Sequence, residues 1–85
     1  MNEIYTLPVC PYCERAKNIL KIKKVEYLEK DISESREVAK EMIVKSGGRK
    51  TVPQIFIGDY HVGGCDDLEA LINSNKFDEI LNNQK

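Results

Sequence analysis

Long hydrophobic runs are absent from this sequence. No unbroken run of Ala, Val, Ile, Leu, Met, Phe, Tyr or Cys exceeds three residues, as in Met42–Val44 and Ile55–Ile57. A membrane-spanning helix needs about 20 apolar residues, and a secretory signal peptide needs a run of roughly 7–15. The sequence therefore predicts a soluble, cytoplasmic protein with no membrane partner.

Neither sign of charge is in excess. Lys and Arg total 13, Asp and Glu total 14, and the formal net charge is -1. Binding to nucleic acid by phosphate neutralisation needs a basic excess, so we expect no nucleic-acid partner. The 85 residues, 41% hydrophobic and 32% charged, suit one globular domain with a small core. We expect residues 1–85 to form that single domain and the protein to be a monomer.

Cysteine is scarce, and its three positions are Cys10, Cys13 and Cys65. An odd, small number of cysteines is a poor disulfide framework for a secreted mini-protein. In a reducing compartment, closely spaced cysteines indicate redox catalysis or metal binding instead. These two chemistries are the hypotheses that the rest of the sequence has to separate.

Hydrophobic periodicity predicts the order strand, helix, strand, helix, strand, strand, helix, helix. An early parallel βαβ unit followed by a hairpin predicts an α/β fold, a mixed four-stranded sheet flanked by helices. Asp31, Ser33 and Ser35 are all candidate N-caps of the second helix. The predicted strands are residues 3–7, 25–32, 54–57 and 60–62. The first predicted helix starts at Tyr12 and has Tyr12, Ala16, Ile19 and Leu20 on its apolar side, and the second lies around residues 38–43. Of the last two predicted helices, one is capped by Asp66 with Glu69 at the capping-box position, and the other is capped by Ser74 or Asn75.

The segment Cys10-Pro11-Tyr12-Cys13 carries the clearest chemistry. Cys10 falls in the turn between a predicted strand and a predicted helix, and Cys13 falls in the first helical turn. Unpaired backbone N–H groups and the positive end of the helix dipole favour the thiolate of Cys10, so its pKa should fall. The thiolate is the nucleophile of thiol–disulfide exchange. We therefore predict Cys10 as the nucleophile and the more enclosed Cys13 as the resolving thiol.

A structural zinc site is the alternative, because His61 and Cys65 could complete a Cys3His set with Cys10 and Cys13. The CxxC pair, however, opens an amphipathic helix after a strand, which is typical of a redox motif. Pro11 also removes a backbone N–H that a zinc turn commonly directs at sulfur. The redox interpretation is therefore favoured, and we assign no metal site and no catalytic role to His61.

Several blocks of the sequence, in their order and spacing, resemble the dithiol glutaredoxins of the small bacterial type. This resemblance runs from Ile4 to about Leu81 and identifies residues 1–85 as a single glutaredoxin domain. It implies a thioredoxin fold, glutathione as cosubstrate, and reduction of disulfides and glutathione mixed disulfides. The blocks are Tyr5-Thr6, Cys10-Pro11-Tyr12-Cys13 with Ala16-Lys17, residues 51–57 (TVPQIFI) and residues 63–68 (GGCDDL).

The resemblance also implies a glutathione groove. Pro53 should be cis and face the cysteines, which would leave the Val52 backbone to pair with an extended peptide. The N–H groups of the helix that starts at Asp66 and Asp67 should hold the α-carboxylate at the γ-glutamyl end of glutathione. The carboxylate of one of these Asp residues should hold the ammonium group at the same end. Helix capping is the alternative role of both Asp residues. The expected glutathione-binding residues are Tyr12, Thr51, Val52, Pro53, Gly64, Cys65, Asp66 and Asp67.

One position departs from the family pattern. A Lys often stands directly after the Tyr-Thr pair, two places after the Tyr, and this sequence has Leu7 there. Arg49 and Lys50 are the nearest cations for the glycine carboxylate of glutathione, or simply residues of a solvated loop. Cys65 is predicted to be a small buried side chain rather than an accessible thiol that becomes glutathionylated.

The predicted function is a glutathione-dependent thiol–disulfide oxidoreductase with a Cys10/Cys13 redox pair and no bound cofactor. Its partners would be glutathione and disulfide-containing or glutathionylated proteins. Ribonucleotide reductase, a reductase of oxidised metabolites and general glutathionylated proteins are all compatible with the sequence. Two alternatives stay open: reduction by a dedicated flavoprotein, as for thioredoxin, and a zinc or iron–sulfur binding module.

Overall fold

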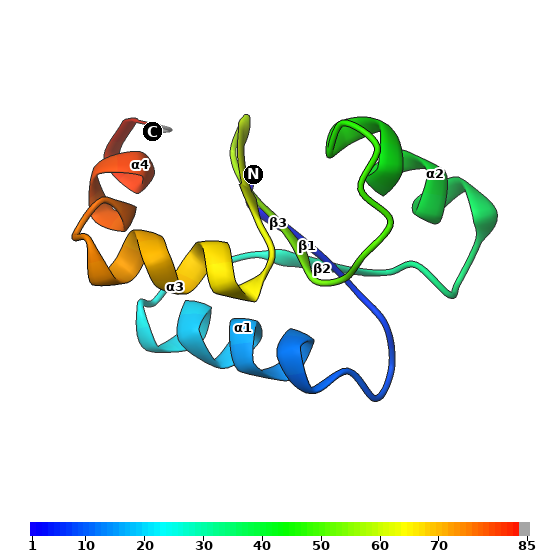
Figure 1. The fold of residues 1–85 in the computed structure, drawn as a ribbon, viewed down its shortest axis with the longest axis horizontal. Coiled ribbons are helices and arrows are strands. Elements are labelled where there is room, and N and C mark those ends of the chain that lie inside the picture. Colours follow the sequence, from blue (N-terminus) through cyan, green and yellow to red (C-terminus); the bar gives the residue numbers. More distant parts are fainter. Residues whose placement is uncertain (84–85) are drawn as a thin grey trace.

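The computed structural model describes residues 1–83. The predicted order of strands and helices is confirmed (Figure 1). In chain order the elements are β1 (Glu3–Thr6), α1 (Pro11–Ile22), β2 (Leu28–Asp31), α2 (Arg36–Lys45), β3 (Gln54–Ile57), β4 (Tyr60–Gly63), α3 (Cys65–Asn73) and α4 (Phe77–Asn83). No helix in this described part of the chain is long and apolar enough to cross a membrane.

The four strands form one mixed sheet in the order β2-β1-β3-β4. β1 pairs parallel with β2 and antiparallel with β3, and β3 pairs antiparallel with β4. Helices α1 and α3 cover one face of the sheet and α2 covers the other (Figure 1). The predicted mixed sheet with flanking helices is therefore correct.

Strand alternation divides the core between the two faces. Ile4, Ile55 and Ile57 pack with buried residues of α1, α3 and α4. The intervening Tyr5 and Phe56 point to the opposite face, where they pack with Met42 of α2. Because successive side chains of a strand point to opposite faces, two short central strands supply both halves of the core.

The predicted apolar side of the first helix and the predicted start of the second strand are each wrong in part. Tyr12 is 59% exposed, and the buried residues of α1 are Cys13, Ala16 and Leu20. The second strand begins at Leu28 rather than at residue 25, and Leu28 is itself exposed. Val25 is buried, but it lies in the connection between α1 and β2. Apolar character alone did not separate a packed connection from a strand.

The helix caps select one of the predicted candidates for α2 and correct the predicted caps of α3 and α4. Among the three candidates for α2, Ser35 is the N-cap, and its Oγ accepts a hydrogen bond from the Val38 N–H at 3.2 Å. The N-cap of helix α3 lies two residues earlier than predicted, at Gly64 rather than Asp66. Ser74 is the C-cap of α3 and does not start α4, which begins at Phe77. Ser and Asp are favourable at several positions around a helix end, so composition alone left these boundaries ambiguous.

Candidate active site

Cys10 is the N-cap of α1 and lies in the turn after β1. Its backbone is extended, with φ of -126° and ψ of 103°, and its Sγ accepts a hydrogen bond from the Cys13 N–H at 3.2 Å. Pro11 follows at the first helical position, where its missing N–H leaves no helical hydrogen bond unmade. The predicted placement of Cys10 at a helix N-terminus is confirmed, with a backbone donor directed at its sulfur.

The two cysteines of this turn differ in exposure and form a disulfide. Cys13 is 1% exposed, whereas Cys10 is half-buried. Their Cα atoms lie 5.2 Å apart, within the range of ordinary disulfides, and the structure holds them as a Cys10–Cys13 bond. The turn can therefore accommodate the oxidised pair, with the more exposed cysteine at position 10.

The Val52–Pro53 peptide bond is cis, as predicted. Pro53 is buried and immediately precedes β3, the central strand that pairs with β1. Thr51 and Val52 precede it on the connection from α2. This connection therefore joins the sheet beside the strand that leads to Cys10.

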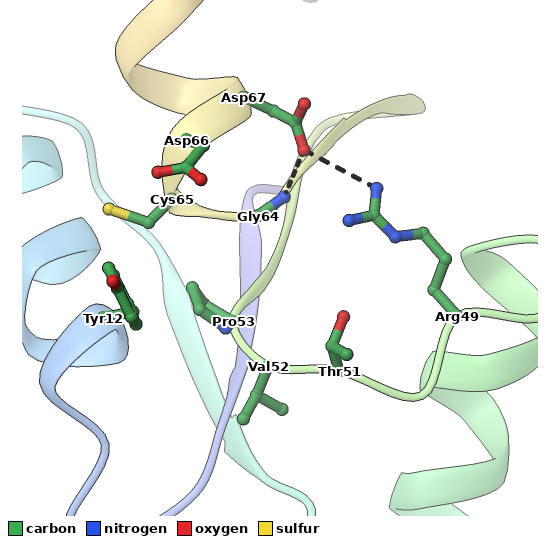
Figure 2. Close-up of a pocket in the computed structure, with 9 residues that line it drawn as sticks. All are labelled: Tyr12, Arg49, Thr51, Val52, Pro53, Gly64, Cys65, Asp66 and Asp67. Atoms are coloured by element: carbon green, nitrogen blue, oxygen red, sulfur yellow. Dashed lines mark hydrogen bonds and ion pairs between the residues drawn. The ribbon is translucent and has the colours of Figure 1, made fainter.

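One cavity of about 270 Å³ brings these segments together (Figure 2). Tyr12, the residue between Pro11 and Cys13, forms one side of it, and the first turn of α3 lies opposite the connection before β3. The cavity is thus adjacent to the redox turn. Its lining consists of all eight residues predicted for the groove together with Arg49: Tyr12, Arg49, Thr51, Val52, Pro53, Gly64, Cys65, Asp66 and Asp67.

The N-terminus of α3 has no side chain at its cap, because the N-cap is Gly64. Asp67, at the N3 position, instead turns back, and its Oδ2 accepts the Gly64 N–H at 2.9 Å. The preceding Gly63 has a φ of 110°, and a Cβ there would lie 2.3 Å from Asp67 Oδ2. Gly63 is therefore required both by its backbone conformation and by the close approach of Asp67.

Arg49 reaches across the cavity to Asp67, with its Nη1 at 3.6 Å from Asp67 Oδ2 (Figure 2). Its backbone N–H donates to Ser46 Oγ at 3.0 Å, and Ser46 Oγ donates to the Arg49 carbonyl at 3.1 Å. Ser46 thus fixes the turn that presents Arg49. The sequence named Arg49 and Lys50 together, but only Arg49 lines the cavity. The role of Ser46 was missed, although a Ser three residues before an Arg across Gly47-Gly48 is a local signal of such a turn.

Cys65 and His61 are two further residues with reactive or titratable side chains near this region. Cys65 is 4% exposed, which confirms the predicted burial, and burial together with Glu69 raises the pKa of its thiol. His61 Nε2 lies 2.8 Å from Gln54 Oε1, and the His61 ring stacks on Phe56. Burial, and next to it the charge of Arg49, lowers the pKa of His61. Within residues 1–83, no group of three or more His, Cys, Asp or Glu side chains is placed to hold a metal ion.

Comparison with known proteins agrees with this arrangement. The glutaredoxin family model matches residues 2–62. The chain belongs to the glutaredoxin family. It is 51% identical over 79 residues to glutaredoxin 3 of Escherichia coli K12, covering 93% of this chain and 94% of that protein.

Two further relatives support the same assignment. The chain is 50% identical over 82 residues to glutaredoxin 1 of Rickettsia conorii, covering 95% of this chain and 80% of that protein. The solution structure of a Brucella melitensis glutaredoxin superposes with a TM-score of 0.84 at 52% identity, covering 99% of this chain and 90% of that one. This glutaredoxin therefore has a thioredoxin fold and is a glutathione-dependent thiol–disulfide oxidoreductase with a Cys10/Cys13 redox pair.

Proposed function

We propose that Cys10 is the nucleophile and Cys13 the resolving thiol in the reduction of protein disulfides. The Cys10 thiolate attacks one sulfur of the substrate disulfide, and the other substrate sulfur leaves as a thiolate and takes up a proton. The Cys13 thiol then loses its proton and attacks the Cys10 sulfur, which releases the second substrate thiol. Two electrons have passed to the substrate, and Cys10–Cys13 is oxidised. Two glutathione molecules restore the dithiol and become oxidised glutathione.

Glutathione mixed disulfides require only one of the two cysteines. The Cys10 thiolate attacks the glutathionyl sulfur, the protein thiol leaves, and Cys10 carries glutathione. A second glutathione thiolate attacks that glutathionyl sulfur, releases Cys10 and forms oxidised glutathione. The hydrogen bond from the Cys13 N–H to Cys10 Sγ supports this assignment, because the backbone donor belongs to the helix and persists when the Cys13 side chain is changed.

The observation that carries the proposal is that the eight residues predicted for glutathione line one cavity beside the redox turn. We assign the cavity to glutathione, with its γ-glutamyl end at the first turn of α3. An α-ammonium and an α-carboxylate are complementary to the neighbouring Asp67 carboxylate and Arg49 guanidinium. The open N–H groups of α3 add to the carboxylate site. Arg49, which of the two candidate cations is the one that lines the cavity, therefore serves the γ-glutamyl end in this proposal.

The wider properties follow from the same chemistry. Glutathione acts as cosubstrate, and no resident cofactor is needed for either cycle. Buried residues of α3 and α4, Leu68 and Phe77, share the core with β1 and β3, which supports residues 1–85 as a single domain. We propose a cytoplasmic location, because a dithiol reduced by glutathione requires a reducing compartment. We also propose that the protein is a monomer. Its protein substrates would be disulfide-containing or glutathionylated proteins, with ribonucleotide reductase among the compatible ones.

The test is a Cys13→Ser variant assayed with two substrates. Removal of glutathione from a mixed disulfide should persist, since it requires Cys10, the cavity and a second glutathione. Reduction of an intramolecular protein disulfide should fall strongly, because the resolving thiol acts at high effective concentration. Val44→Ser, at an exposed position of α2 outside the cavity, is the control and should retain both activities.

Each alternative predicts a different result. An enzyme of the thioredoxin type would lose both activities in Cys13→Ser, since its mixed disulfide could not resolve. A zinc or iron–sulfur module would show neither activity in the unmodified protein and would lose metal on substitution of Cys10. If both activities of a folded Cys13→Ser variant fall to background, the proposed division of roles between the cysteines is wrong.

A further inference from the structure

Val9, the residue before Cys10, combines two unfavourable features. Its φ is 53°, in the left-handed region, which a β-branched side chain rarely adopts. Its side chain is also fully exposed, so side-chain packing does not offset the free-energy cost of this backbone conformation. Backbone conformations of this kind persist mainly at functional sites, where the observed strain points to a role. Val9 therefore needs an explanation that the fold itself does not provide.

Val9 belongs to an apolar rim around the nucleophile, formed by Leu7, Val9 and Tyr12. These are three of the eight large hydrophobic side chains that are exposed in the described part of the chain, and they fall within six residues of sequence. Residues 7–13 contain no charged side chain, although 32% of the whole chain is charged. The loop that carries Leu7 and Val9 lies at the edge of the fold, beyond the N-terminal end of α1 (Figure 1).

We propose that Val9 contacts the protein substrate and selects substrates with apolar residues beside the reactive cysteine. This inference rests on the proposed role of Cys10 as the nucleophile. A substrate sulfur has to reach Cys10 Sγ, so the residues flanking the substrate cysteine meet the residues flanking Cys10. Uncharged, apolar side chains on the rim favour apolar side chains on the substrate, because charged ones would lose water without gaining a partner. The occupant is a polypeptide that carries a disulfide or a glutathionylated cysteine.

The left-handed conformation has a direct consequence for this contact. In this conformation the Val9 side chain is fully exposed and is therefore available to a substrate. Asn accepts the same conformation readily and is polar. Val9→Asn therefore removes the apolar contact while retaining the turn. Val44→Asn is the matched control, because Val44 on α2 is 78% exposed and lies outside the rim.

The experiment uses two glutathionylated peptides that differ only in the residues flanking their single cysteine, Leu in one and Glu in the other. The unmodified protein should have the higher kcat/KM for the Leu peptide. Val9→Asn should lower kcat/KM for the Leu peptide about threefold to tenfold, as expected for loss of one partly buried valine contact. The mixed disulfide of free cysteine with glutathione, which has no flanking residues, should be reduced at an unchanged rate. Val44→Asn should behave like the unmodified protein with all three substrates.

Equal kcat/KM of the unmodified protein for the two peptides would overturn the inference, as would an unchanged preference in Val9→Asn. A loss of activity toward the cysteine–glutathione disulfide in Val9→Asn would also overturn it, because Val9 would then act through the nucleophile. Failure of the proposed function gives a separate result. In that case the unmodified protein does not reduce the cysteine–glutathione disulfide at all.

Discussion

Two helix N-termini face the same region of this protein and are completed in different ways. At α1 the N-cap is Cys10, and its own sulfur accepts the Cys13 N–H at 3.2 Å. At α3 the N-cap is Gly64, which has no side chain, and Asp67 folds back to accept the Gly64 N–H at 2.9 Å. The first helix thus directs its positive end at a sulfur of the protein. The second has no side-chain cap hydrogen bond from its N-cap residue, and its first turn lines the cavity.

The N-cap residue of each helix determines which group accepts hydrogen bonds from the first N–H groups of that helix. A third helix shows the ordinary case, since α2 is capped by Ser35, whose hydroxyl accepts the Val38 N–H. All three helices present the same backbone donors and the same dipole. In α2 the serine hydroxyl accepts one of these donors, in α1 the cysteine sulfur accepts one, and in α3 the glycine N-cap has no side chain that could accept any. Four predictions test this comparison, and they follow in order of decreasing expected effect.

Cys10→Ser should have the largest effect, because it gives α1 the same N-cap as α2. Serine is a good N-cap, so the helix and the fold should be retained. All activity should fall to background, since the alcohol has a pKa far above neutrality and does not replace the thiolate. Turnover with a glutathione mixed disulfide, measured beside thermal unfolding of the reduced protein, checks both parts. Substantial turnover by the purified variant would contradict the assignment of Cys10.

Asp67→Asn should weaken glutathione use more than stability. The amide oxygen still accepts the Gly64 N–H, whereas the charge that faces Arg49 and the proposed ligand ammonium is lost. A charge-assisted contact contributes about 1.5–3 kcal/mol, so KM for glutathione should rise about 10- to 150-fold. Loss of stability should stay near 1 kcal/mol or below.

Asp78→Asn is the control for this experiment, because Asp78 is an exposed acidic residue of α4 that pairs with Lys23 outside the cavity. It should leave the glutathione dependence unchanged. An unchanged KM in Asp67→Asn together with a large loss of stability would assign Asp67 to helix capping alone.

Gly64→Ser should increase stability and weaken glutathione use. Gly64 has the extended backbone of an N-cap, and an added Cβ would meet the Pro53 carbonyl oxygen at an ordinary 3.6 Å. The new hydroxyl would accept the Asp67 N–H and compete with the ligand carboxylate, raising KM for glutathione about 2- to 10-fold. Stability should rise by a few tenths of a kcal/mol, roughly the difference between Gly and Ser at an N-cap. Gly64→Ala separates the causes: a rise in KM as large as that of Gly64→Ser would indicate steric exclusion instead.

The smallest effect concerns His61, on the strand that leads into α3. Its pKa is lowered by burial and by Arg49, so the folded protein favours the neutral ring. Below the unfolded pKa of about 6.5 the unfolded chain binds more protons, and the free energy of unfolding should fall as pH decreases from 7 to 5.5. His61→Gln should flatten this dependence. Denaturant unfolding at pH 7 and at pH 5.5 measures this change in the free energy of unfolding. An equal change in the unmodified protein and in His61→Gln would exclude His61 as its source.

The sequence predicted the features that rest on short local patterns. The strand-to-helix position of Cys10, the hairpin around Gly58 and the order of elements follow from periodicity and turn residues, and the structure confirms them. The cis bond before Pro53 came from the family resemblance, since composition does not determine it.

Features that depend on three-dimensional packing were harder to predict. The cap of α3 was misplaced because Asp66 and Asp67 both suit a first helical turn, and only the backbone shows that Gly64 caps it. The approach of Arg49 to Asp67 joins residues that are distant in sequence, and the left-handed Val9 leaves no trace in composition. Such contacts follow from how the connections cross the fold, which local patterns do not encode.

The most direct test of the two N-termini is a backbone amide NMR comparison of the reduced Cys13→Ser variant with and without glutathione bound to Cys10 as a mixed disulfide. The account predicts shifts at the amides of residues 52 and 64–67, caused by the ligand backbone and its α-carboxylate. The amide resonances of residues 36–38, at the capped N-terminus of α2, should not shift. Shifts confined to residues 7–13, with none at residues 64–67, would contradict the claim that the open N-terminus of α3 binds glutathione.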